Sequence, residues 1–107
     1  MGYSHQKLIE ILAYALIITG NHIFTSGATG TNAAVIRGAL RAETPDLLTV
    51  VLPQSFETQP SESQGLLKQV TNVITMPQHD DLPLIDASSI CNKDIISRVN
   101  QVGHALG

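Results

Sequence analysis

Charged residues, cysteine and long apolar runs are all scarce in this chain of 107 residues. Charged side chains make up 14% of the sequence, and six basic against nine acidic residues give a formal net charge of −3. The whole chain therefore lacks the basic excess that is typical of nucleic-acid-binding proteins. The 43% hydrophobic content excludes a disordered chain, which combines low hydrophobicity with high net charge. We expect one globular domain over residues 1–107.

Cysteine, metal-ligand and membrane signals are weak or missing. Cys91 is the one cysteine, so an internal disulfide and a cysteine-based zinc site are excluded. His79, Asp80 and Asp81 are consecutive, so their side chains point in different directions, and we expect neither a metal nor a cofactor. The longest apolar run, residues 11–18, is about half of a membrane span. No secretory leader is visible at the start of the chain, so we expect a cytoplasmic protein.

The spacing of apolar residues predicts an α/β fold. Helical periodicity alternates with short apolar runs of the kind buried on both faces of a parallel sheet. Strand, helix and strand in succession predict a small parallel sheet of about three strands, flanked by helices in three layers. Ser61 and Gln64 have the form of a capping box at the start of a helix. We expect helices at 5–18, 32–42, 61–70 and from Ser88 or Ser89 to about 102, and strands at 22–26, 47–52 and 72–76.

One small-residue loop joins a predicted strand to a predicted helix and has the composition of a phosphate-binding turn. Its residues are Ser26, Gly27, Ala28, Thr29, Gly30, Thr31 and Asn32. Backbone N–H groups and the positive end of a helix dipole attract anions, and the two glycines permit a positive φ. The glycine spacing matches neither a Walker A loop nor a dinucleotide fingerprint. The alternative is a tight, well-capped turn that binds no ligand.

Two basic residues on the following helix could extend such an anion site. Arg37 and Arg41 are four residues apart and therefore share one helix face. A pair of this kind is also typical of a solvated helix face. No serine lies in a nucleophile-elbow pattern, so we expect binding and not catalysis.

Three segments together resemble a known family. Thr25-Ser26-Gly27-Ala28-Thr29-Gly30-Thr31-Asn32-Ala33-Ala34, followed by Arg37-Gly38-Ala39-Leu40, resembles the strand, loop and helix of the DNA-processing protein A (Smf) family. Cys91-Asn92-Lys93-Asp94-Ile95-Ile96-Ser97 resembles the Arg-Asn-Arg-Ile-Ile-Ala helix of that family. Leu52-Pro53-Gln54-Ser55 and residues 87–93 are similar to the short DNA recombination-mediator protein A-like proteins of cyanobacteria.

The resemblance implies a Rossmann-like domain of a nucleotide-binding superfamily. It implies a nucleotide or single-stranded DNA as ligand, with phosphate contacts from 26–32, Arg37, Asn92 and Lys93, and a recombinase as partner. One alternative is a nucleoside-phosphate N-glycosidase of the same superfamily, but the Pro-Gly-Gly-x-Gly-Thr-x-x-Glu motif of those enzymes does not occur here. A further alternative is an interaction subunit without a ligand.

Relative to that family, we expect a domain truncated at both ends. The family's opening strand, which ends in Gly-Ser-Arg, has no counterpart before the first predicted helix, and the family continues beyond the Asn92 helix. A shortened sheet exposes strand edges, and the first helix is apolar on more than one face. We therefore expect a homo-oligomer, or pairing with another subunit.

Overall fold

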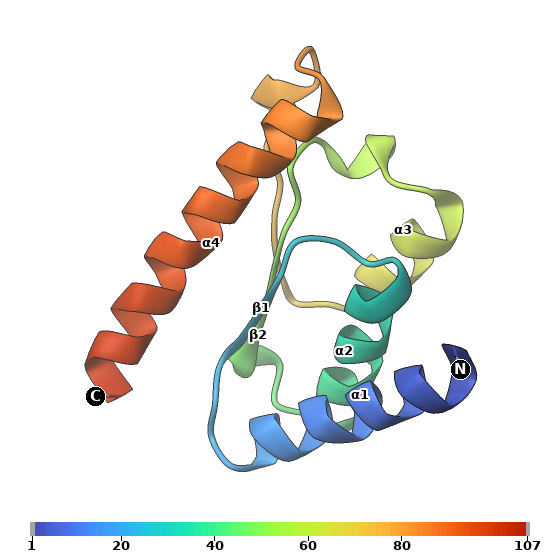
Figure 1. The fold of residues 1–107 in the computed structure, drawn as a ribbon, viewed down its shortest axis with the longest axis vertical. Helices are drawn as coiled ribbons and strands as arrows, with labels where there is room; N and C mark the ends of the chain where they lie inside the picture. The colour runs from blue at the N-terminus through green and yellow to red at the C-terminus, as the bar shows by residue number, and fades with distance from the viewer. Residues whose placement is uncertain (1, 107) are drawn as a thin grey trace.

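The computed structural model describes residues 2–106, and within that range the burial of side chains 5–100. Helices and strands alternate through the middle of the chain, and a long helix stands at each end (Figure 1). The helices are α1 (Gly2–Ile18), α2 (Gly30–Arg41), α3 (Ser61–Leu67) and α4 (Leu84–Leu106), and the strands are β1 (Ile23–Thr25), β2 (Leu48–Val51) and β3 (Asn72–Ile74).

The three strands form one parallel sheet in the order β1-β2-β3. Phe24 pairs with Thr49, and Val50 pairs with Val73 across the second interface. Both crossovers step in the same direction, so right-handed connections place α2 and α3 on the same face of the sheet. Figure 1 shows α4 on the opposite side of the strands from α1, α2 and α3. The predicted α/β fold with a small parallel sheet flanked by helices is confirmed.

Apolar residues fill the space on both faces of the sheet. Between the sheet and α2 and α3, the fully buried side chains include Ile36, Leu52 and Leu67. On the α4 face a smaller cluster contains Cys91, whose thiol donates a hydrogen bond to the Val51 carbonyl at 3.1 Å. The central strand β2 is buried along its whole length, which is typical of a strand covered on both faces.

The helix boundaries correct several predictions. The last helix begins at Leu84 instead of Ser88 or Ser89, because Pro83 starts it and its carbonyl accepts the N–H groups of Asp86 and Ala87. The capping box is also wrong. Pro60 occupies the N-cap of α3, and the Gln64 side chain donates to the carbonyl of Gln59 at 2.8 Å. α3 ends at residue 67, and the outer strands are two residues shorter than predicted.

α1 packs closely along α2. Gly38 of α2 lies directly against the backbone of α1, where a side chain would overlap the carbonyl of Glu10. Ala13 and Ile17 of α1 are buried at this contact or in the adjoining core. In the part of the chain that the structure describes, no helix combines the length and the apolar character that crossing a membrane requires.

Candidate phosphate-binding site

The loop between β1 and α2 has the predicted strand-to-helix geometry. Gly30 adopts a φ of +54°, whereas Gly27 does not enter the left-handed region. Thr29 is the N-cap of α2, with extended backbone and no capping bond from its side chain. The N–H groups of Asn32 and Ala33 both point to the Thr29 carbonyl, at 3.0 and 3.4 Å. Among the described residues the N–H groups of Gly30 and Thr31 have no acceptor.

The start of α2 opens into a cavity of about 350 Å³. This volume lies within the range of small-molecule sites. Helices α1, α2 and α3 all contribute to the wall. α2 and α3 follow the loops after β1 and β2, and these loops meet because the carboxyl ends of adjacent parallel strands lie at one edge of the sheet. The lining residues are Gln6, Ala28, Thr29, Gly30, Ala33, Arg37, Pro60, Glu62, Ser63 and Leu66. We call this space the loop cavity.

Two buried hydroxyl groups fix the shape of the loop. Ser63 of α3 is 1% exposed, and its hydroxyl donates to the Ala28 carbonyl at 3.2 Å. The hydroxyl of Thr25, at the end of β1, donates to the Gly27 carbonyl at 3.2 Å. These bonds engage loop carbonyls and hold the start of α3 against the loop. Gly30, the first residue of α2, lines the cavity beside this framework.

The charges at the loop cavity are nearly balanced. Arg37 and Glu62 both line the cavity and carry opposite charges. Arg37 is also paired with α1, because its Nε donates a hydrogen bond to Glu10 Oε2 at 3.3 Å. This bond uses Nε and leaves the two terminal nitrogens of the guanidinium for a ligand. Arg41 pairs with the other Glu10 oxygen at 3.4 Å and does not line the cavity.

Glu10 joins α1 to the two arginines of α2. Desolvation acts to raise the pKa of Glu10, but the hydrogen bond from Arg37 and the charges of Lys7, Arg37 and Arg41 outweigh it, and the pKa lies below its usual value. Glu10 therefore stays ionised at neutral pH and offsets part of the positive charge near the loop. Arg41 also lies over the ring of Tyr14, 5.3 Å from its centroid.

The structure brings together only some of the predicted site residues. Ala28, Thr29, Gly30 and Arg37 line the loop cavity, whereas the Asn32 side chain lines a groove between α1 and β1. Ser26 and Gly27 belong to the turn, and Thr31 belongs to α2, which begins two residues before the predicted start at residue 32; none of the three lines the cavity. Asn92 and Lys93 are exposed on α4, across the sheet from α2, and do not line it either.

Sequence patterns missed the half of the cavity that comes from α1 and α3. Gln6, Glu62 and Ser63 are distant from the glycine loop in sequence. The predicted parallel sheet does place the carboxyl ends of β1 and β2 at one edge, and this topology favours a contribution from α3. No local pattern indicated that α1 would contribute Gln6.

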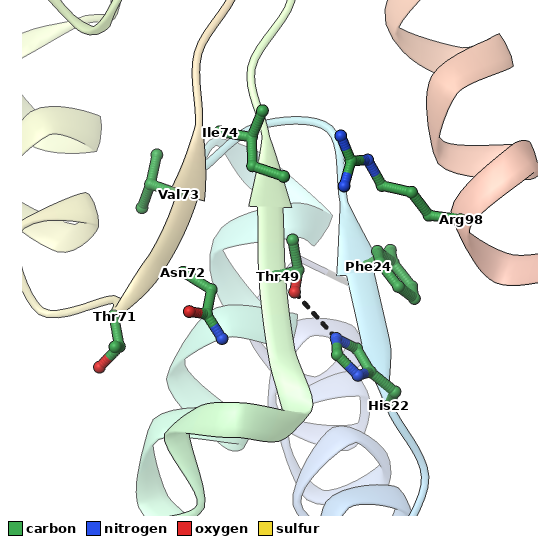
Figure 2. Close-up of a pocket in the computed structure, with 8 residues that line it drawn as sticks. All are labelled: His22, Phe24, Thr49, Thr71, Asn72, Val73, Ile74 and Arg98. Carbon is green, nitrogen blue, oxygen red and sulfur yellow. Dashed lines mark hydrogen bonds between the residues drawn. The ribbon is translucent and has the colours of Figure 1, made fainter. Parts of the chain in front are cut away.

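A second cavity, of about 400 Å³, lies between the sheet and α4 (Figure 2). His22, just before β1, stacks on Phe24 of β1 with ring centroids 4.4 Å apart, and His22 Nε2 is hydrogen-bonded to the Thr49 hydroxyl at 2.8 Å. Burial lowers the pKa of His22, so its ring is neutral at pH 7. Arg98 reaches toward this cavity from α4, but its Nε is paired with Asp94 Oδ2 at 2.6 Å. The pairing leaves the two terminal nitrogens of Arg98 free, as it does for Arg37, but none of the residues lining this cavity lies at the start of a helix.

Comparisons with known proteins leave the family open. The chain matches no protein-family model, no curated protein and no solved structure. Within the described residues, His, Cys, Asp and Glu side chains form no group of three that could hold a metal ion.

Proposed function

We propose that the chain is a cytoplasmic, non-enzymatic binding protein for the phosphate group of a nucleotide, held in the loop cavity. One observation carries the proposal: the N–H group of Gly30 has no acceptor among the described residues and shares the cavity with the Arg37 guanidinium. An anion at the start of α2 would accept from the backbone and interact favourably with the helix dipole. Arg37 would add a charge-assisted hydrogen bond.

The nucleotide part of the proposal also draws on the resemblance to DNA-processing protein A. The same phosphate chemistry could come from single-stranded DNA, but two features favour a single nucleotide. The loop cavity is of mononucleotide size and has no aromatic side chain on which successive bases could stack. The net charge of −3 also opposes the approach of a polyanion. A recombinase partner stays a prediction from the resemblance.

Calorimetric titration with adenosine monophosphate, adenosine and a short oligothymidylate tests this proposal. We expect the monophosphate to bind, adenosine to bind far more weakly, and the oligonucleotide to bind no better per phosphate. Arg37→Gln should weaken monophosphate binding about tenfold, the size of one charge-assisted hydrogen bond. Glu62→Gln should tighten binding severalfold, because it removes a negative charge from the cavity wall.

Arg41→Gln is the matched control. Arg41 pairs with the same Glu10 carboxylate as Arg37, but it does not line the loop cavity. Its loss should therefore change monophosphate affinity much less than the loss of Arg37. Equal effects of the two substitutions would contradict a direct contact from Arg37. Failure of every nucleotide to bind at millimolar concentration would favour an interaction subunit without a ligand.

The N-glycosidase alternative has one structural feature in its favour. Glu62 lines the same cavity as the glycine loop and carries a carboxylate, the group that such an enzyme uses. Incubation with nucleoside monophosphates and chromatography for free base tests this alternative. We expect no release of base, and release that disappears in Glu62→Gln would establish an enzyme.

A further inference from the structure

The outer face of α1 is apolar although it is exposed. Ala13 and Ile17 are buried on the inner side of the helix. The opposite side carries five aliphatic side chains that are each between 48% and 58% exposed: Leu8, Ile11, Leu12, Leu16 and Ile18. With Ala15, which is also exposed, they cover about half of the helix circumference. We call these six residues the α1 outer face.

The α1 outer face has no charged side chain between Leu8 and Ile18. The charged residue in this interval, Glu10, is turned toward α2, where it pairs with Arg37 and Arg41. A surface lipid anchor would require basic residues along the polar side of the helix. α1 offers Lys7 alone for this role, and Lys7 is itself within 3.8 Å of Glu10. A membrane surface is therefore a poor occupant.

We propose that the α1 outer face is a dimer interface, on which the same face of a second copy of this chain packs. Leu8, Ile11, Ala15 and Ile18 follow the three-then-four spacing by which two helices interlock their side chains. A two-fold axis brings identical surfaces together, so any charge on the face would meet a like charge in its partner. The uncharged α1 outer face meets this condition.

The exposed area agrees with a weak but specific dimer. Five half-exposed aliphatic side chains leave on the order of 500 Å² of apolar surface, the size of the largest patch on an ordinary monomer. Two copies would bury about 1,000 Å² in total, which is the lower bound for a specific interface. A groove of about 290 Å³ between α1 and β1 continues the surface through Ile9 and can take side chains of the second copy. An interface of this size is at the weak end of specific association, so we expect the dimer to dissociate on dilution.

Sedimentation equilibrium of the whole chain between about 1 and 500 μM tests the dimer. The wild type should change from 11.4 kDa to twice that mass across this range. Ile11→Glu and Ala15→Glu each place two carboxylates in the symmetric interface, and each should weaken association at least a hundredfold. Both positions are exposed, so thermal unfolding should show a folded monomer.

Ile85→Glu on α4 is the matched control. Ile85 is 79% exposed, so the substitution removes as much surface hydrophobicity without touching α1. This variant should dimerise like the wild type. A wild type that stays at 11.4 kDa throughout, or folded Ile11→Glu and Ala15→Glu variants that still dimerise, would overturn the proposal. Flotation of the monomer with phosphatidylserine vesicles would overturn it in favour of a lipid surface.

Discussion

Replacing Gly38 with alanine should separate α1 from α2 and destabilise the fold. Gly38 is buried where the two helices touch. An added β-carbon would overlap the backbone carbonyl of Glu10 and come within 3.0 Å of the Ala13 β-carbon. Neither neighbour is the end of a flexible side chain, so neither can move aside without displacing its helix. The strain must therefore be relieved by a shift of α1 as a whole.

Two opposing effects set the size of this loss. Overpacking of a well-packed core costs about 1–3 kcal/mol, and a clash with backbone belongs at the upper end of that range. Alanine returns about 1 kcal/mol, because glycine is a poor residue in the interior of a helix. The net loss in the free energy of unfolding is therefore about 2 kcal/mol. With a urea m-value of about 1.5 kcal/mol/M, the midpoint should fall by more than about 1 M.

Urea unfolding followed by circular dichroism measures the effect, and Gly65→Ala is its control. Gly65 lies within α3, and a β-carbon there would meet nothing within 4 Å. Gly65→Ala should therefore stabilise the protein by up to about 1 kcal/mol through helix propensity alone. A Gly38→Ala variant as stable as Gly65→Ala would refute the close approach of α1 and α2.

Three further predictions concern titratable groups. Burial, with a smaller contribution from Asp94, raises the pKa of the Cys91 thiol to about 11. The thiol should therefore resist alkylation at pH 8 until urea is added, and the free energy of unfolding should fall as pH rises from about 9 toward 11. Burial lowers the pKa of His22 below 6.5. The stability that neutral His22 contributes above pH 6.5 is therefore lost as pH falls through the pKa of the folded state. His22→Gln should remove this part of the pH dependence of unfolding. Glu10→Gln releases Arg37, and calorimetry should show monophosphate binding tightened about threefold. Equal alkylation rates with and without urea would contradict the burial of Cys91. An unchanged loss of stability at low pH in His22→Gln would contradict the role given to His22, and weaker monophosphate binding by Glu10→Gln would contradict the role given to Glu10.

The order of the elements could be predicted from sequence, because apolar periodicity is a local signal. β2 is buried on both faces, and its run of leucines and valines indicates this directly. Helix boundaries could not be predicted as well, since more than one residue near each helix start was suited to cap it. The carbonyl of Pro83 closes the first turn of α4, which begins four residues before the first of two serines that suit an N-cap. Gln64 bonds to Gln59 instead of completing a capping box.

The loop of the candidate site could also be predicted, but its electrostatics could not. A positive φ was expected at Gly27 or Gly30, and Gly30 adopts it. The pairing of Arg37 with Glu10, however, joins residues 27 positions apart and depends on how α1 crosses α2. Glu62 lines the cavity because α3, in the crossover from β2 to β3, packs on the same face of the sheet as α2. Contacts of this kind depend on tertiary packing, and no pattern within a segment encodes them.

Nuclear magnetic resonance of the backbone amides during titration with adenosine monophosphate tests the central claim most directly. Our account predicts that the amide resonance of Gly30 shifts most, because its N–H group gains an acceptor, that the neighbouring Thr31 amide shifts less, and that the Arg37 side-chain resonance moves with them. Adenosine should leave all three in place. Shifts confined to α4 around Lys93 or to the cavity of His22, with Gly30 and Thr31 unmoved, would contradict a phosphate site at the start of α2.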